Sequence, residues 1–173
     1  MQNPNLIKLA HCSNLSCTTS TKTTVVEITD NGDANNQPDL KGLTIGGDGF
    51  PVILYGLQKR QNEKDKWVKV VHCHDVQCTS STTNTVDPDT YTQLGPLVGI
   101  TTGGDGLPLI LYEATYEGRK IAHCNDAACS DVTISNFIPG DLFGSITTGS
   151  DGLGLIAYED GRSEERRGGK ECR

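Results

Sequence analysis

Short apolar runs of strand length alternate with polar turn signals along this chain, and one such run recurs three times. Each copy opens around an Asp-Gly pair and ends in tyrosine, and the copies are Gly47–Tyr55, Gly104–Tyr112 and Ser150–Tyr158. In the middle copy, apolar side chains occupy odd and even positions alike from Leu107 to Tyr112. Because neighbouring side chains of a strand point to opposite faces, the pattern predicts a β-strand that is covered on both faces.

A second element, His-Cys followed by four residues and another Cys, also occurs three times. The copies are His11–Cys17, His72–Cys78 and His123–Cys129. The Asp-Gly pair favours a tight hairpin, because glycine accepts positive φ and the aspartate side chain can bond the backbone amides just beyond it. With a further turn at Gly118-Arg119 and a strand near 131–137, each repeat predicts four antiparallel strands.

A four-stranded antiparallel unit of about 40 to 50 residues, with its sheet buried on both sides, is typical of a β-propeller blade. We therefore expect an all-β chain in which neighbouring units cover each other's faces, as part of a β-propeller. The predicted propeller fragment, residues 1–161, divides into a half unit 6–30, units 41–86 and 97–138, and a half unit 142–160. Since propellers close with about four to eight blades, we expect this chain to be a segment of a larger array.

The Gly/Ser-x-Asp-Gly-x-Pro-x-Ile-x-Tyr pattern, combined with a strand that ends in His-Cys, resembles bacterial extracellular repeats related to sialidase-type propellers, also called BNR or Asp-box propellers. The resemblance covers residues 6–160. The resemblance implies a fold but hardly any chemical function. The family motif has Ser-x-Asp-x-Gly-x-x-Trp, whereas here glycine directly follows Asp105 and no tryptophan stands at the later position.

Residues 162–173 share neither composition nor pattern with the repeats, and they resemble the conceptual translation of a sequencing adapter; a genuine disordered tail is the alternative. The whole chain has 15 basic and 22 acidic residues, of which five and three lie in this tail, so the remainder carries a net charge of −9. That charge argues against nucleic-acid binding through a basic face. No stretch approaches the roughly 20 apolar residues of a membrane span.

Apart from Cys172, all cysteines fall into three pairs of identical spacing. Directly opposed residues of an antiparallel pair have Cα atoms about 4.5 to 5.5 Å apart, which suits a disulfide. We therefore predict three disulfides, Cys12–Cys17, Cys73–Cys78 and Cys124–Cys129. Zinc ligation and free thiols are the alternatives, but neighbouring strand residues point to opposite faces, so His-Cys does not converge easily on one ion. Disulfides would place the protein outside the reducing cytosol.

The repeated turn residues have structural explanations. Asp48, Gly49, Asp105, Gly106, Asp151 and Gly152 are predicted to build the hairpin turns. Catalytic carboxylates or calcium ligands are the alternatives for the aspartates, although calcium needs six to eight oxygens. If the units surround an axis, the equivalent histidines would form a ring that binds an anion or a metal; the simpler alternative is a bond to a neighbouring backbone carbonyl. These histidines are His11, His72 and His123.

No constellation of residues predicts a specific reaction, catalytic residue or cofactor. The leading interpretation is a non-catalytic extracellular or cell-surface module, with any secretion signal upstream. It would bind a glycan or protein through the variable loops 30–39, 58–66 and 87–95. One alternative is a fragment of a sialidase-like glycoside hydrolase whose catalytic residues lie elsewhere, although Arg60 and Arg119 are the only arginines before the tail. A purely structural envelope or adhesin repeat is another.

Overall fold

The computed structural model describes residues 5–28, 37–58, 66–88, 99–114, 118–137 and 142–159. Every regular element in these ranges is a β-strand. The first six strands are β1 (Asn5–Cys12), β2 (Ser20–Ile28), β3 (Gln37–Ile45), β4 (Pro51–Gln58), β5 (Lys66–Cys73) and β6 (Ser81–Thr85). The other six are β7 (Gly99–Thr102), β8 (Pro108–Ala114), β9 (Gly118–Cys124), β10 (Val132–Asn136), β11 (Leu142–Thr148) and β12 (Gly154–Glu159).

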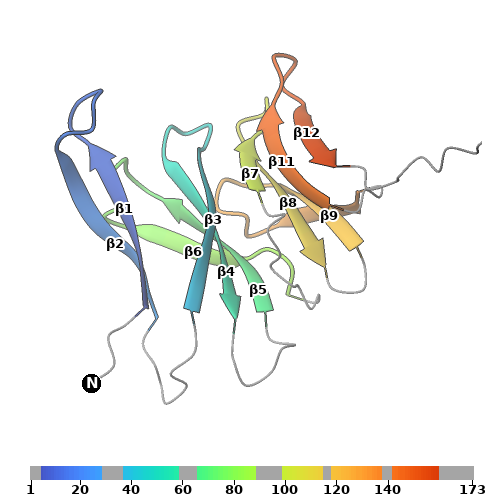
Figure 1. Cartoon of the computed structure of the whole chain (residues 1–173), viewed down its shortest axis with the longest axis horizontal. Helices are drawn as coiled ribbons and strands as arrows, with labels where there is room; N and C mark the ends of the chain where they lie inside the picture. The colour runs from blue at the N-terminus through green and yellow to red at the C-terminus, as the bar shows by residue number, and fades with distance from the viewer. Residues whose placement is uncertain are drawn as a thin grey trace, which may run out of the picture.

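The strands form four antiparallel sheets that follow one another along the chain (Figure 1). We call them sheet A (β1-β2), sheet B (β3-β4-β5-β6), sheet C (β7-β8-β9-β10) and sheet D (β11-β12). In sheets B and C each strand pairs with the next one in the sequence. The predicted all-β class and the four-stranded antiparallel units are therefore confirmed.

The doubly apolar strand is buried on both sides because its two faces contact different sheets. In β4, Val52 and Leu54 point into a cluster shared with sheet C, whereas Ile53 and Tyr55 point into a cluster shared with sheet A. These four side chains are at most 4% exposed. Burial of this kind is worth about 1.5 to 3 kcal/mol for each large apolar side chain, so stacking of sheets is the main source of stability.

The first strands of the sheets contact one another, β3 against β7 and β7 against β11. Glycine allows the close approach at both places. A Cβ atom on Gly42 would lie 2.8 Å from Cγ2 of Ile100, and one on Gly99 would lie 3.0 Å from Cγ2 of Ile146. Sheet C therefore packs against sheet D through the same kind of contact as sheet B against sheet C.

The hairpins 46–50, 103–107 and 149–153 and the cysteine loops that follow β1, β5 and β9 lie at one end of the sheets. We call it the turn end. In Figure 1 the connections β1-β2, β3-β4 and β11-β12 mark it at the top. The predicted site residues of the repeats lie in or beside these turns, whereas the strand ends that flank the variable segments lie at the opposite end.

Candidate functional site

The three Asp-Gly repeats form five-residue hairpin turns of the same geometry. In sheet C, the Gly106 amide donates to the Gly103 carbonyl at 3.0 Å, and Gly106 has φ +81°, a value that few side chains tolerate. Oδ1 of Asp105 accepts the Leu107 amide at 3.0 Å. The hairpins of sheets B and D repeat these contacts. Here the aspartate holds the turn through its side chain, as an Asx turn does.

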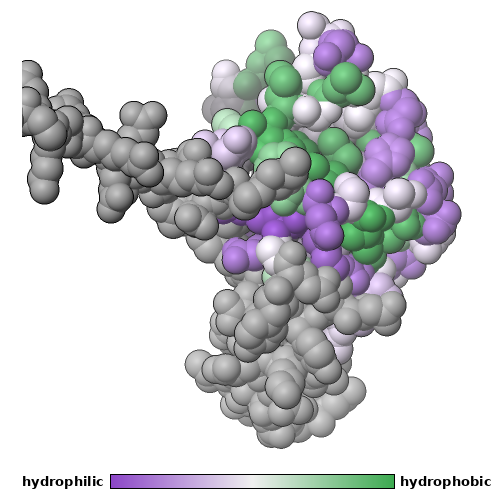
Figure 2. Space-filling model, turned by 90° about the vertical axis from the view of Figure 1, so that its right-hand side faces the viewer, coloured by the Kyte–Doolittle hydropathy of each residue, from purple (hydrophilic) through white to green (hydrophobic). Residues whose placement is uncertain are grey.

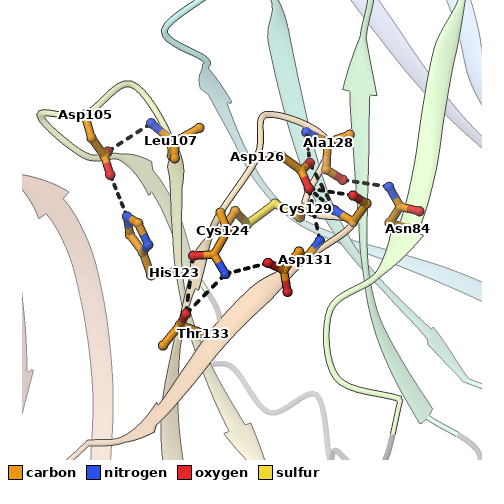
Figure 3. Close-up of a disulfide and its surroundings, with 12 residues drawn as sticks. Asn84, Asp105, Leu107, His123, Cys124, Asp126, Ala128, Cys129, Asp131 and Thr133 are labelled. Atoms are coloured by element: carbon orange, nitrogen blue, oxygen red, sulfur yellow. Dashed lines mark hydrogen bonds and ion pairs between the residues drawn. A yellow bond between two sulfur atoms is a disulfide. The ribbon is translucent and has the colours of Figure 1, made fainter.

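The second carboxylate oxygen of the turn aspartate bonds the histidine of its own sheet. Nε2 of His72 lies 2.7 Å from Oδ2 of Asp48, and Nε2 of His123 lies 2.7 Å from Oδ2 of Asp105, as Figure 3 shows for sheet C. The pair joins the third strand of a sheet to the hairpin between its first two strands. Each of these histidines therefore has a carboxylate partner within its own sheet, an arrangement that the predicted ring did not anticipate.

The carboxylates of both pairs have pKa values below the ordinary value for aspartate. For Asp105 the largest cause is the hydrogen bond from the Leu107 amide, which outweighs partial burial, and His123 adds to it. For Asp48 burial is the largest single influence and raises the pKa, but the backbone amide of Phe50 and the His72 ring together outweigh it. Both carboxylates are therefore ionised acceptors at neutral pH.

All three predicted disulfides are present, with Cα–Cα distances of 4.8 Å. The two cysteines of a pair are not directly opposed, however. Cys73 faces Ser81 across the ladder, whereas Cys78 lies inside the loop with φ +56°. The expectation of opposed partners was wrong because the loop turns back through a left-handed residue before β6 begins. The cysteines are therefore engaged with each other and not available as thiolate ligands.

Each cysteine loop is also held by a side chain two residues after its first cysteine, which the sequence analysis missed. In sheet C, Asp126 accepts the amides of Ala128 and Ser130 and the Ser130 hydroxyl (Figure 3). Asp75 makes equivalent contacts in sheet B, and Asn14 bonds Thr18 in sheet A. The hydroxyl bonds are the largest cause of the lowered pKa of both aspartates.

Hairpins of successive sheets are joined directly through glycine. The Gly47 amide donates to the Gly106 carbonyl, and the Gly104 amide donates to the Gly152 carbonyl, both at 2.8 Å. A Cβ atom on Gly104 would lie 2.8 Å from Cα of Gly152, so the backbones touch. Glycine is therefore required as the second residue of the hairpins of sheets B and C by contact with the next sheet, whereas the hairpin of sheet D has Ser150 at this position.

Threonines of the first strands extend this connection away from the hairpins. The hydroxyls of Thr44 and Thr102 lie 3.0 Å apart, and those of Thr101 and Thr148 lie 2.8 Å apart. The Thr102 hydroxyl also donates to the Ile45 carbonyl at 2.6 Å, as the Thr148 hydroxyl does to the Thr102 carbonyl. The threonine-rich segment before each Asp-Gly pair thus bonds sheet to sheet.

Two grooves lie at the turn end. The groove between sheets C and D, of about 460 Å³, is lined by Asp105, His123 and Asp151 among several glycines. The groove between sheets A and B, of about 210 Å³, is apolar apart from His11, and its lining includes Leu9, Leu43, Ile45, Pro51 and Val76. The lining of the first groove includes two carboxylates and a histidine as well as Leu109 and Leu153, whereas the lining of the second suits an apolar side chain.

A buried polar cluster lies between sheets B and C. The Tyr112 hydroxyl donates to Oδ2 of Asp87 at 2.7 Å, and Nζ of Lys120 lies 3.5 Å from the same oxygen. Asp87 is only 3% exposed. Since a buried carboxylate needs such partners, the cluster explains why the tyrosine that ends the apolar run lies against the preceding sheet. Its burial makes it a contact between sheets and not an open site.

In the ranges that the structure describes, no three histidine, cysteine or acidic side chains converge in a way that could hold a metal ion. Nor do those ranges contain a helix of the length and apolar character needed to cross a membrane. Most of the predicted variable loops, as well as Arg60 and the tail 162–173, lie outside the described residues. The sequence-predicted aspartates, glycines, cysteines and histidines are all brought to the turn end.

Comparison of the chain with family models, with curated proteins and with solved structures finds no match. The resemblance to Asp-box propellers stays a prediction from the repeat residues.

Proposed function

We propose that this chain is a non-catalytic binding or structural module of an extracellular β-propeller, in which sheets B and C are blades and sheets A and D are parts of blades. The observation that carries the proposal is the recurrence of one inter-sheet contact set. The bond from Gly47 to Gly106 is repeated by the bond from Gly104 to Gly152, and the Thr44–Thr102 contact by Thr101–Thr148. In a radial array of blades, each blade must contact the next one in the same way.

The polar side chains at the turn end support a structural role for it. Oδ1 of Asp105 holds its own hairpin, and Oδ2 holds His123. Asp126 holds its cysteine loop through several amides. These bonds occupy the acceptor positions that a catalytic carboxylate would offer to a substrate, so they favour a scaffold over an active centre.

The three disulfides indicate an oxidising environment, because thiols are kept reduced in the cytosol. A secreted or surface-displayed location is the simplest such environment for a repeat protein with a net negative charge. The strand ends that flank the variable segments lie at the end opposite the turns, for example Gln58 of β4 and Lys66 of β5. Ligand specificity is proposed to lie there, on a glycan or a protein, because repeat folds keep their framework and vary their loops.

The test is a binding panel with the full chain produced in an oxidising host. We expect binding to glycans or extracellular proteins that is lost when the segment 59–65 is replaced by the shorter 115–117, while circular dichroism stays unchanged. Shortening the cysteine loop 125–128 should instead lower stability. Hydrolysis of a fluorogenic sialoside would favour the sialidase-like alternative, and failure to bind any member of the panel would favour a purely structural repeat.

A further inference from the structure

Sheets A and D are complementary halves of one unit. In sheet C, β8 pairs with β9. By position in the repeat, β12 corresponds to β8, because both follow an Asp-Gly hairpin, and β1 corresponds to β9, because both end in His-Cys. Among the described strands, β12 pairs only with β11, and β1 pairs only with β2. Each half therefore presents the edge that the other half would pair with.

We propose that β12 of one copy of this chain pairs with β1 of a second copy, so that two copies complete two further four-stranded sheets and close into a ring. The proposal rests on the propeller arrangement proposed above. A second copy of this chain occupies both free edges. An exposed, unpaired edge is a ready template for such pairing.

The register follows from sheet C. There Leu109 faces His123, and Tyr112 faces Lys120. Transferred to the two halves, Leu155 would face His11, Ile156 would face Ala10 and Tyr158 would face Lys8.

The same register supplies a missing hydrogen bond between aspartate and histidine. Asp48 and Asp105 each bond the histidine of their own sheet. Sheet D, however, contains Asp151 without the third strand that carries a histidine, and sheet A contains His11 without an Asp-Gly hairpin. Both side chains lie at the turn end. In the completed sheet Asp151 and His11 would occupy the positions of Asp105 and His123, so that pairing of the halves gives each its partner.

Apolar surface is complementary as well. In the chain, the side chain of Leu109 reaches sheet D, where a Cβ atom on Gly154 would lie 2.6 Å from it. The equivalent Leu155 is 56% exposed. Figure 2 shows that apolar side chains reach the surface on the right-hand side of the view in Figure 1. The position equivalent to Gly154 in sheet B is Pro51, which lines the apolar groove between sheets A and B. Leu155 of one copy would therefore enter that groove in the other.

The first strands fit in the same way. Gly42 and Gly99 each contact Cγ2 of an isoleucine in the next sheet. At the junction between copies, Ser145 of β11 stands at the position of these glycines, and Leu43 of β3 stands at the position of the isoleucines. Leucine has no methyl group on Cβ, which leaves room for the Cβ of serine. Leu43 is 54% exposed in the single chain and would be covered.

The described strands of each chain make two four-stranded sheets and two two-stranded halves, which amount to three sheets. Two copies paired through their halves supply six sheets, a number within the range of about four to eight blades with which propellers close. Both junctions are then equivalent by two-fold symmetry, which is the commonest symmetry of soluble oligomers.

The experiment measures the mass of the full chain by light scattering after gel filtration, with Cys172→Ser to prevent crosslinking through the seventh cysteine. We expect twice 18.6 kDa. Leu155→Glu should lose the dimer and give a monomer with unchanged circular dichroism. Ile134→Glu is the matched control, since Ile134 is also a partly exposed apolar strand residue but lies on β10, away from both free edges, and it should remain dimeric.

A crosslink identifies the strands. In the Cys172→Ser chain, Ala10→Cys with Ile156→Cys should give a covalent dimer on oxidation, because these positions face each other between copies. A wild-type chain that stays monomeric at all concentrations, an open series of larger species, a crosslink within one chain, or a dimer that survives Leu155→Glu without crosslinking would each overturn the proposal. These results are independent of the binding panel, so a dimer that binds nothing would contradict the proposed binding function alone.

Discussion

The three disulfides have the same spacing but different burial, which makes them a matched test of how the sheets pack. Cys124 and Cys129 are 0% and 1% exposed in the cluster between sheets B and C, whereas Cys12 and Cys17 are exposed. We predict that replacing Cys124 and Cys129 together by alanine destabilises the chain about twice as much as replacing Cys12 and Cys17.

The magnitudes come from two contributions. Closing a six-residue loop restricts the unfolded chain by about 2 kcal/mol, and this contribution is the same for all three pairs. Removing two buried sulfur atoms adds a transfer loss of roughly 0.8 kcal/mol each and a cavity cost, about 2 kcal/mol together. The expected losses are therefore about 4 kcal/mol for the buried pair and about 2 kcal/mol for the exposed pair.

The assay is urea unfolding followed by circular dichroism, with each double variant made in the Leu155→Glu background. That background keeps the chain monomeric, so that the Cys12–Cys17 disulfide stays exposed. Cys73 and Cys78, which are 0% and 3% exposed between sheets A and B, should behave like the buried pair. Equal losses for the three pairs, within about 0.5 kcal/mol, would show that loop closure alone matters and that the packing described for the disulfides is incorrect.

Three further predictions use the same urea assay. Gly104→Ala should lose about 1 to 3 kcal/mol, because its Cβ would press on the backbone of Gly152, and an unchanged midpoint would contradict the contact between hairpins. Ile110→Ala should lose about 2 to 5 kcal/mol, since Ile110 is 0% exposed between two sheets; a loss typical of a surface site would contradict its burial. The lowered pKa of Asp105 stabilises the folded state above the ordinary aspartate pKa of 3.8, and this stability is lost as pH falls through the lower folded value. Asp105→Asn should therefore flatten the fall in stability between about pH 5 and about pH 2, and an unchanged pH profile would exclude Asp105 as its source.

The strands could be predicted because their signals are local. From Leu107 to Tyr112 the chain carries apolar side chains on both faces, and Asp105-Gly106 specifies the hairpin before it, so neither prediction needs knowledge of the neighbouring sheet. The disulfide partners were equally local, since each pair is separated by five positions. The burial of Cys124 and Cys129 depends on sheet B and is not encoded in the loop itself.

The pairing of aspartate with histidine could not be predicted from spacing. Asp48 and His72 are 24 positions apart, whereas Asp105 and His123 are 18 apart. The difference arises because sheet B has a longer segment between its second and third strands and because each of these strands is one residue longer than in sheet C. The loop residue Asp126 did have a signal, since an aspartate or asparagine occurs two positions after the first cysteine in every copy. The role of Asp126 depends on the loop turning back so that the amides of Ala128 and Ser130 approach its carboxylate, and the spacing of the cysteines does not specify this turn.

The repeats differ at one position of the first strand, and this position lies at the proposed junction between two copies of the chain. Thr102 and Thr148 each donate a hydroxyl to the first strand of the preceding sheet, but the equivalent position in β3 is Ile45, which has no donor. Ile45 is 53% exposed and lines the apolar groove. A strand that docks beside β3 therefore gives up one hydrogen bond, worth about 0.5 to 1.5 kcal/mol, and gains apolar burial of about the same size. A junction between separate copies can be of this kind, because both of its surfaces are exposed to solvent before the copies associate.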